Sequence, residues 1–203
     1  MNENVVFEIV KQITWIEWIG TIFGLLTVWY SVKSNILTWP TGIISVTAFG
    51  VLFFQIKLYS DALLQIFFLV MCIAGWWNWS LKKNDQKELP ITYLKDKDRY
   101  KIAGLMLGFI ILSGWFFSSF TDAHIPFWDS TATGISITAQ LLLIRKKFET
   151  WFLWIIVDIL SIGIYLYKEV YLTTFLYVVF LCMAIKGYFE WKKQIVKQKE
   201  LSL

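Results

Sequence analysis

The sequence has few of the residues on which most catalytic and metal sites depend. Among its 203 residues there are one histidine, two cysteines and three prolines. His124 is predicted to lie in a short loop, so catalysis or metal binding by histidine has little support. Cys72 and Cys182 lie in separate apolar segments without CxxC spacing, which indicates packing residues and argues against a disulfide or a metal site. No cofactor and no metal are expected.

Sequence signals of several other protein classes are missing as well. The phosphate-binding pattern G-x-x-x-x-G-K-[ST] does not occur, which excludes a chain that is driven by its own ATP hydrolysis. Residues 1–12 have no basic start, apolar core or small-residue cleavage site, so we expect the N-terminus to be retained. The net charge of +4 requires no nucleic acid as a partner, because loops that face anionic lipid would carry such a charge.

Apolar residues make up most of what is present. The chain is 57% hydrophobic and 19% aromatic, far above a soluble domain of this size. A helix needs roughly 17 to 20 apolar residues to cross about 30 Å of hydrocarbon. The sequence therefore predicts an all-α integral membrane protein with seven transmembrane helices. The predicted spans are 13–32, 39–57, 61–80, 100–119, 128–144, 150–167 and 172–191.

The distribution of Lys and Arg predicts how these helices are oriented. If the N-terminus lies outside, fifteen of the nineteen Lys and Arg residues fall on the cytoplasmic side and three on the outer side. This excess matches the positive-inside rule. We therefore place the N-terminus outside and the C-terminus in the cytoplasm. The polar loop 81–99 fits either an ordered cytoplasmic cover or a mobile linker.

The chain contains an internal repeat. Segment 39–79 aligns with segment 151–191 without a gap, at an offset of 112 residues. A gapless alignment that matches glycines, aromatic residues and charges indicates a duplication rather than chance matching of apolar residues. The matched pairs include Trp39 with Trp151, Gly75 with Gly187 and Trp79 with Trp191, and the same offset carries back into the preceding helices to Glu17 with Asp129 and Thr38 with Thr150.

The duplication predicts a 3+1+3 arrangement within a single membrane transport domain, 1–203. Three helices in 13–79 form the first repeat and three in 125–191 the second. The helix 100–119 joins them and gives both repeats the same orientation, and 192–203 form a cytoplasmic tail. Transporters often bind substrate near the bilayer midplane between such repeats, with alternating access to the two sides.

An acidic residue lies within one of the most apolar segments. Trp151, Trp154 and Asp158 have the spacing i, i+3, i+7, which places them within about 60° of one another on a helix. Asp158 would lie roughly 10 Å deeper than Trp151. A carboxylate near mid-membrane costs about 2.5 to 3.5 kcal/mol, so it is expected to face a cavity or a site. The alternative is a protonated aspartate bonded to a neighbouring helix, with both tryptophans at the membrane interface.

Three amide side chains are candidate partners of this face. They are Gln140, Gln65 and Asn78. An amide offers both donors and acceptors to a ligand, although each of the three fits a role in helix association equally well or better. Two indoles, amides and one anion suit a flat, cationic heteroaromatic solute, since cation–π attraction and the carboxylate would offset its desolvation.

These residues resemble the PnuC family of bacterial vitamin transporters, which share a fold with the SWEET sugar carriers. The family pattern W-x-x-W-x-x-x-N/D is met by Trp151, Trp154 and Asp158. By this resemblance Trp151, Trp154 and Asp158 form the wall of the substrate site, with Gln140 and Gln65 as amide contacts. Asn78, Trp39 and Tyr177 are further candidate substrate-binding residues. Other family-typical stretches are WPTGII at 39–44, LYSDALLQ at 58–65, GWWNW at 75–79, FWDS at 127–130, AQLLLIRK at 139–146 and YLTTFLY at 171–177.

The resemblance implies uptake of nicotinamide riboside, a permanently charged pyridinium nucleoside, by facilitated diffusion. It also implies a homotrimer in the bacterial inner membrane and a cytoplasmic kinase that traps the substrate. The sequence departs from the better-known carriers of this vitamin at Asp158, where asparagine is usual. Aspartate is more usual in relatives that carry other vitamins, so thiamin stays open as a second substrate.

The sequence gives less support to two other classes of protein. An enzyme would need a nucleophile, a metal cluster or paired acids at depth, and Asp158 is the single deep acid in the predicted spans. A channel or scaffold would not need tryptophans and an acid on one helix face. Asp158 would be the residue to couple protons, but a single acid without a relay partner favours a uniporter.

Overall fold

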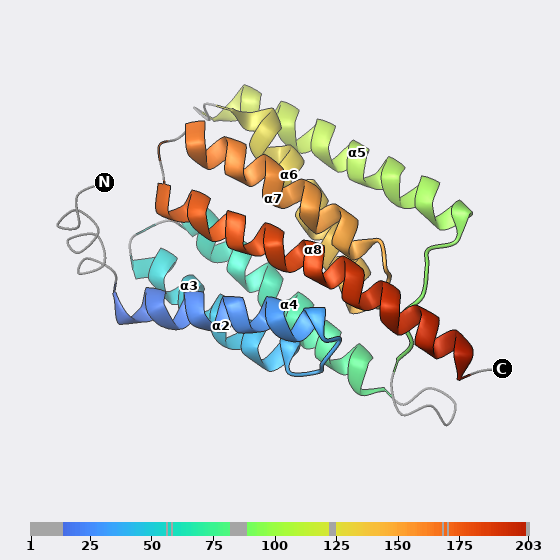
Figure 1. Ribbon diagram of the computed structural model, residues 1–203. Helices are drawn as coiled ribbons and strands as arrows, with labels where there is room; N and C mark the ends of the chain where they lie inside the picture. The colour runs from blue at the N-terminus through green and yellow to red at the C-terminus, as the bar shows by residue number, and fades with distance from the viewer. Residues whose placement is uncertain are drawn as a thin grey trace. The chain divides into compact units, whose positions relative to one another are not determined.

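The computed structural model of the chain (Figure 1) describes residues 14–55, 57, 59–81, 89–121, 125–167, 169 and 171–201. His124 and the N-terminal residues 1–12, on which sequence predictions were made, lie outside this part. Within the described residues the fold is all-α, and the strand-like pairing is confined to an isolated bridge between Thr92 and Lys147. The helices are α2 (Trp15–Val32), α3 (Thr38–Gln55), α4 (Tyr59–Ser80), α5 (Asp96–Phe120), α6 (Pro126–Ile144), α7 (Thr150–Tyr167) and α8 (Tyr171–Glu200).

Length and apolar composition make this a multi-pass membrane fold. Six of the helices in the described part are long and apolar enough to cross a bilayer, namely α2, α3, α4, α5, α7 and α8. The remaining helix, α6, has 19 residues, which at 1.5 Å per residue is roughly 28 Å. Its lower hydropathy comes from the polar residues Asp129, Ser130, Thr131, Thr133, Ser136, Thr138 and Gln140. The predicted all-helical membrane fold with seven helices is confirmed.

Local sequence explains where several helices begin. At α2 the Glu17 carboxylate accepts from the Thr14 N–H at 2.6 Å, while the Glu17 N–H donates to the Thr14 hydroxyl at 3.3 Å. This capping box satisfies donors that the first turn of a helix leaves unpaired. Pro126 is the first residue of α6, a position where its missing N–H costs no hydrogen bond.

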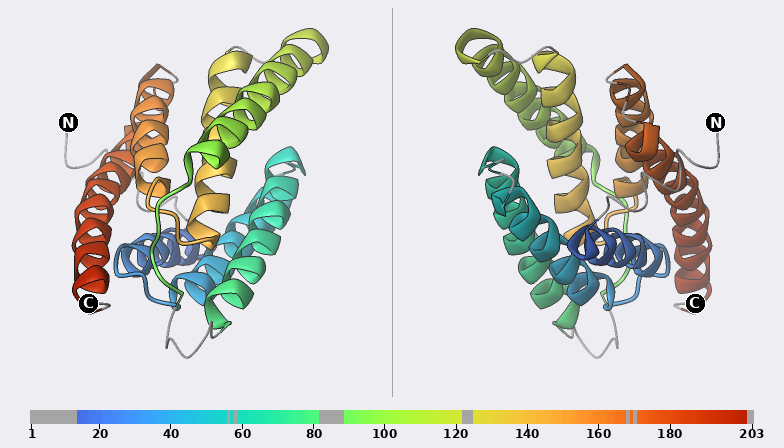
Figure 2. Two further views of the ribbon diagram at one scale, coloured as in Figure 1. Left: turned by 90° about the vertical axis from the view of Figure 1, so that its right-hand side faces the viewer. Right: turned by 90° about the vertical axis from the view of Figure 1, so that its left-hand side faces the viewer.

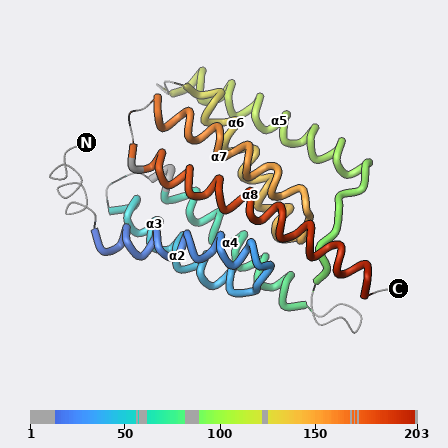
Figure 3. The backbone as a smooth tube through the Cα atoms, viewed as in Figure 1, coloured from blue at the N-terminus to red at the C-terminus, as the bar shows by residue number. Residues whose placement is uncertain are grey.

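Helices α5 and α8 are longer than the sequence patterns predicted. The expected tail 192–203 is helical up to Glu200, and Figure 3 shows α8 as one uninterrupted helix. Its last turns contain neither glycine nor proline and are rich in good helix formers, while Ile195 remains 6% exposed. Helix α5 begins at Asp96 instead of residue 100. Acidic side chains in the first turn stabilise a helix because they interact favourably with the positive end of its dipole.

The chain forms two compact units, residues 1–80 and 81–203. In the first unit α3 packs against both α2 and α4. In the second unit α5 packs on α6, α6 on α7, and α7 on α8. Figure 2 shows α5 (green) and α6 (yellow) as neighbouring helices of this unit. The helix predicted as a link between repeats is therefore an integral part of the second unit.

The loops of the two units repeat the same backbone conformation. Ser34 and Lys146 have positive φ angles of 51° and 46°, and Lys57 and Glu169 have φ angles of 64° and 59°. Both pairs are separated by 112 residues. Positive φ is uncommon for residues other than glycine, so its occurrence at two pairs of equivalent positions is strong structural support for the repeat.

The first two helices of each repeat are joined by an equivalent hydrogen bond. In the first unit the Thr38 hydroxyl donates to the carbonyl oxygen of Thr27 at 2.7 Å. In the second unit the Thr150 hydroxyl donates to the carbonyl oxygen of Ala139 at 2.8 Å. Both threonines are almost fully buried, and a buried hydroxyl is costly unless it is bonded. The threonine thus fixes where the second helix starts relative to the first.

A tryptophan packed on a glycine joins the second and third helices of each repeat. Trp151 of α7 lies edge-on to Trp191 of α8, with ring centroids 5.5 Å apart and planes at 87°, beside Gly187. The equivalent contact in the first unit brings Trp39 against Trp79 at 5.1 Å and 90°, beside Gly75. We call each of these contacts a tryptophan wedge.

Replacing Gly187 by alanine is expected to destabilise the protein. A Cβ atom at this position would lie 2.6 Å from three ring atoms of Trp151, so the ring or the helix would have to shift, at a cost of about 1–3 kcal/mol. Gly163→Ala is the matched control, because a Cβ at Gly163 meets nothing within 4 Å. Thermal unfolding in detergent should give a lower Tm for Gly187→Ala only. Equal Tm values for the two variants would contradict the wedge.

Candidate functional site

The two repeats differ most clearly on one face of α7. Asp158, Ser161 and Tyr165 follow one another at intervals of three and four residues, so they share a side of the helix. The equivalent residues in α3 are Val46, Phe49 and Phe53, which are all apolar. Since the threonine bond and the tryptophan wedge occur in both units, the fold does not require polar residues at these positions.

These three residues meet Tyr177 of α8 in a polar cluster, in which Asp158 and Ser161 are buried and the two tyrosines are partly exposed. Asp158 and Ser161 are each 4% exposed. The Tyr177 side chain lies close enough to Ser161, Tyr165 and Asp158 to interact with each of them. The rings of Tyr165 and Tyr177 stack with centroids 5.3 Å apart and planes 17° from parallel. We call Asp158, Ser161, Tyr165 and Tyr177 the polar cluster.

The polar cluster confirms that Asp158 is buried, and it adds two residues that the sequence prediction missed. Ser161 and Tyr165 were not among the predicted site residues. The helical spacing that linked Trp151, Trp154 and Asp158 continues to both of them, so the signal was present in the sequence. Among the described residues no three His, Cys, Asp or Glu side chains are grouped as a metal site requires.

The two tryptophans of the predicted motif have different surroundings. Trp151 is 2% exposed and forms the wedge with α8. Its indole N–H has no hydrogen-bond partner among the described residues, and the same holds for Trp39 in the first unit. The unpaired N–H is therefore a property of both wedges. Trp154 is partly exposed and replaces Gly42 of the first unit, which makes it a second specific difference between the repeats.

Gln140 lies close to the start of α7. It directly follows Ala139, whose carbonyl oxygen accepts the Thr150 hydrogen bond. The Gln140 side chain is partly exposed, and its equivalent in the first unit is Val28. The second unit thus gains an amide at the junction of α6 and α7 where the first unit has an apolar residue.

The other three predicted site residues belong to the first unit. Gln65 of α4 is partly exposed, and its side chain packs on Gly50 of α3. It occupies the position equivalent to Tyr177, so the repeat places a polar side chain at this point in both units. Asn78 is partly exposed near the end of α4. Trp39 is 1% exposed within its wedge.

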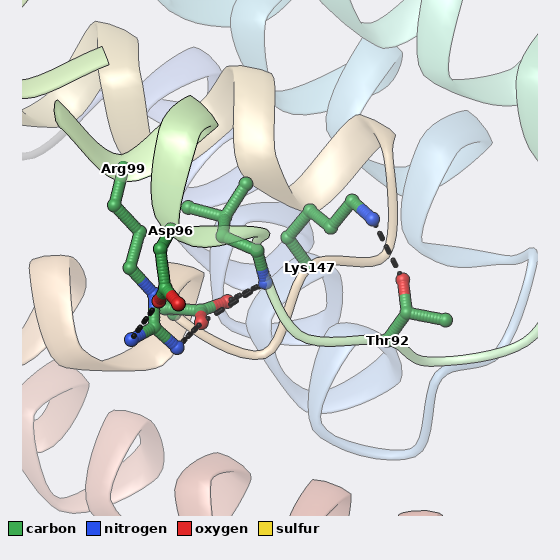
Figure 4. A network of polar contacts seen from close by, with 6 residues as sticks. Thr92, Asp96, Arg99 and Lys147 are labelled. Atoms are coloured by element: carbon green, nitrogen blue, oxygen red, sulfur yellow. Dashed lines mark hydrogen bonds and ion pairs between the residues drawn. The ribbon is translucent and has the colours of Figure 1, made fainter. Parts of the chain in front are cut away.

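An ordered strap, residues 89–95, runs along the loop that precedes α7. The Thr92 N–H donates to the Lys146 carbonyl oxygen at 3.1 Å, and the Phe148 N–H donates to the Thr92 carbonyl oxygen at 3.0 Å. Ile91 is buried at 3% exposure. The Lys147 ammonium group also donates to the Thr92 hydroxyl at 2.8 Å (Figure 4). This part of the loop 81–99 is therefore an ordered cover.

Glu149 anchors the end of this strap beside the tryptophan motif. Its two carboxylate oxygens accept from the Leu94 N–H at 3.0 and 3.1 Å. The same carboxylate accepts from the Arg99 guanidinium group at 3.0 Å (Figure 4). Glu149 is two residues before Trp151, and its equivalent in the first unit is Leu37. The strap therefore holds the start of α7 to the start of α5.

Several known transport proteins are similar to this chain in sequence or in fold. The crystal structure of the vitamin B3 transporter PnuC has the same fold, with a TM-score of 0.75 and 23% sequence identity over 96% of this chain and 87% of that one. The nicotinamide riboside transporter PnuC of Escherichia coli is 31% identical over 205 residues, which cover 89% of this chain and 86% of the relative. The riboflavin/roseoflavin transporter RibM of Streptomyces davaonensis is 23% identical, over 89% of this chain and 86% of the relative.

The fold and these relatives define the class: a multi-pass membrane transport protein, and not an enzyme. The sequence model of one family, described as nicotinamide mononucleotide transporter, matches residues 14–193. The chain belongs to this family. The resemblance to PnuC that the motifs indicated is thereby confirmed.

Glu149→Gln is expected to loosen the strap. The change removes the ion pair with Arg99 and one of the two carboxylate acceptors, and hydrogen bonds to charged groups contribute about 1.5–3 kcal/mol. Hydrogen exchange measured by mass spectrometry should become at least about tenfold faster in residues 89–99, since about 1.4 kcal/mol corresponds to a factor of ten.

Glu190→Gln is the control for this measurement. Glu190 pairs with Lys193 at 3.6 Å on an exposed face of α8, where an ion pair contributes little. Exchange in residues 89–99 should be unchanged in this variant. If Glu149→Gln also leaves it unchanged, the carboxylate does not hold the strap.

Proposed function

We propose that the protein takes up nicotinamide riboside, and that the polar cluster of the second unit contributes to its binding site. The observation that carries this proposal is the buried Asp158, placed among hydrogen-bonding side chains where the first repeat has Val46. A buried carboxylate in a membrane helix is costly and marks a functional position. The names of the relatives given above supply the solute, which is cationic.

The chemistry of the solute matches the side chains of the second unit. Its pyridinium ring carries a permanent positive charge, its carboxamide has both donors and acceptors, and its ribose has hydroxyl groups. The Asp158 carboxylate would accept from the amide or the hydroxyls and offset the charge, while the Trp154 indole would stack on the cationic ring. Tyr177 and Gln140 would supply further hydrogen bonds.

We also propose that Trp151 defines the shape of the site and that Trp154 makes the broader contact. Trp151 is buried in its wedge, whereas Trp154 is partly exposed. Gln65, Asn78 and Trp39 of the first unit stay predictions from the sequence.

A nucleoside fits the polar cluster better than a nucleotide. The family description mentions the mononucleotide, which carries a phosphate group. None of the four residues of the polar cluster is a cation, and one is an acid. A phosphate beside Asp158 would place like charges together in a poorly solvated environment, where their repulsion is strong. The nucleoside carries a positive charge alone and avoids this cost.

Thiamin is the second candidate, and Asp158 itself favours it. The carboxylate would pair with the aminopyrimidine edge of thiamin or with its thiazolium charge. An asparagine would keep hydrogen bonds with the carboxamide and hydroxyls of the nicotinamide nucleoside at a modest loss of charge balance, but it would lose the pairing of a carboxylate with the aminopyrimidine edge of thiamin. The identity of the residue at position 158 is therefore the feature that separates the two substrates.

The proposed mechanism is uniport by alternating access of the two repeats. Asp158 would be the single acid at depth, without a second acid to relay protons. The N-terminus would lie outside and the C-terminus in the cytoplasm of a bacterial inner membrane, as the positive-inside bias predicts. Assembly as a homotrimer and trapping of the solute by a cytoplasmic kinase complete the proposal. A channel or scaffold is the alternative class, and saturable uptake would separate a carrier from a pore.

Titration calorimetry on purified protein tests the substrate. We expect wild type to bind nicotinamide riboside and not thiamin. Asp158→Asn should weaken this binding by about tenfold or less, because asparagine keeps an acceptor but loses the charge. Asp158→Ala should weaken it more, because it leaves donors of the solute unpaired.

Glu17→Gln serves as the control, since Glu17 is occupied in the cap of α2; its binding should equal that of wild type. Binding of thiamin by wild type, lost in Asp158→Asn, would assign the protein to thiamin. Binding of neither vitamin would contradict the proposed site.

Uptake into vesicles tests the mechanism. In proteoliposomes loaded with unlabelled substrate, exchange of labelled nicotinamide riboside should persist when the proton gradient is collapsed with an uncoupler, because a uniporter needs only the substrate gradient. The initial rate should saturate with substrate concentration. Loss of uptake on adding the uncoupler would show proton coupling, and a rate that rises without limit would indicate a pore.

A further inference from the structure

A cavity of about 250 Å³ lies between α5 and α6 of the second unit. None of its lining residues belongs to the proposed substrate site. It is close to the end where α5 passes into α6, and it contains one acidic residue and three hydroxyl side chains. The lining residues are Phe109, Ser113, Phe117, Pro126, Asp129, Ser130 and Thr133.

The polar atoms of this cavity are almost all hydrogen-bond acceptors. The Ser113 hydroxyl donates its proton to the Phe109 carbonyl oxygen at 2.7 Å, and the Thr133 hydroxyl donates to the Asp129 carbonyl oxygen at 2.9 Å. Both hydroxyls therefore offer only lone pairs to the cavity. The Asp129 carboxylate adds a negative charge, and among the described residues that line the cavity there is no lysine or arginine.

Ser130 adds an unsatisfied group to the same wall. Its side chain is 4% exposed, and its hydroxyl has no hydrogen-bond partner among the described residues. A buried hydroxyl without a partner is costly, and such groups in native proteins call for a ligand or a water. The counterpart of Ser130 in the first unit is Trp18, so the repeat does not require a serine here.

These features specify a ligand with positive charge and several N–H donors. A primary ammonium group has three donors and one charge, which suits one carboxylate and surrounding lone pairs. A cavity of about 150 Å³ already admits benzene, so 250 Å³ accommodates an ammonium group with its neighbouring carbon atoms. A trimethylammonium group has the same charge but no N–H donor, and would leave the acceptors unpaired.

The neighbouring surface indicates where such a group comes from. Large aromatic side chains are exposed at this end of α5 and α6: Trp115 at 58%, Phe120 at 65% and Trp128 at 58%. Tryptophans and other aromatic residues gather at the level of the lipid head groups. The polar cavity beside them thus lies at the depth where head groups are the abundant source of ammonium.

We propose that this cavity binds the primary ammonium group of a lipid with an ethanolamine head group, held by Asp129 and Ser130. The Asp129 carboxylate accepts from the ammonium group and balances its charge, and the Ser130 hydroxyl gains the hydrogen bond that it lacks within the protein. The glycerol and acyl chains remain outside, against the exposed apolar face of α5. This inference does not depend on which vitamin the protein carries.

Native mass spectrometry of the full chain, with lipids of identical acyl chains, tests this site. We expect ethanolamine lipid to bind wild type at about tenfold lower concentration than choline lipid. Asp129→Asn and Ser130→Ala should each reduce ethanolamine-lipid binding several-fold and bring it close to that of choline lipid. Glu17→Gln is the matched control, because Glu17 occupies the position in the first unit that is equivalent to Asp129, and it should bind as wild type does.

A second readout separates binding from folding. Lipid-free Ser130→Ala should unfold at the same temperature as wild type or higher, since it loses only an unsatisfied hydroxyl, yet ethanolamine lipid should raise its Tm less than that of wild type. Equal binding of the two lipids by wild type, or unchanged ethanolamine-lipid binding in both variants, would overturn the proposal. Free ethanolamine that binds as tightly as the lipid would overturn the lipid as the source.

Discussion

Close contact between a tryptophan and a glycine on the neighbouring helix is the constraint on which both halves of this protein depend. Trp151 fits beside Gly187 only because glycine has no Cβ atom. The wedge sets the distance and rotation between α7 and α8, and these in turn bring Tyr177 to the polar face of α7. The proposed site is therefore positioned by packing that has no polar role of its own.

Comparison of the two repeats distinguishes residues that the fold requires from residues that serve a function. The wedges, the threonine bonds and the left-handed loop residues recur at the same offset in both units. Asp158, Trp154 and Gln140 have apolar or small counterparts in the first unit. The fold does not require these three polar or aromatic side chains, because the equivalent helices of the first unit form the same contacts without them. This difference is a stronger argument for function than burial alone.

Sequence alone predicted the helices and the repeat, because hydropathy and a gapless internal alignment record them directly. It placed Asp158 correctly in the interior, since a charge within an apolar run has few alternatives. It ended α8 too early, because a lysine-rich segment resembles a tail when its buried residue, Ile195, is not recognised. The strap could not be predicted either. Pairing of Thr92 with the loop before α7 joins residues 55 positions apart, and no local pattern encodes such a contact.

The threonine bond between the first two helices of each repeat has an evolutionary consequence. Its acceptor is a backbone carbonyl, Thr27 in one unit and Ala139 in the other, and every residue type provides that group. Side chains at the acceptor position can therefore change without loss of the bond. A repeat held by such bonds keeps its helix spacing while neighbouring side chains change, as Val28 and Gln140 do beside the two acceptors.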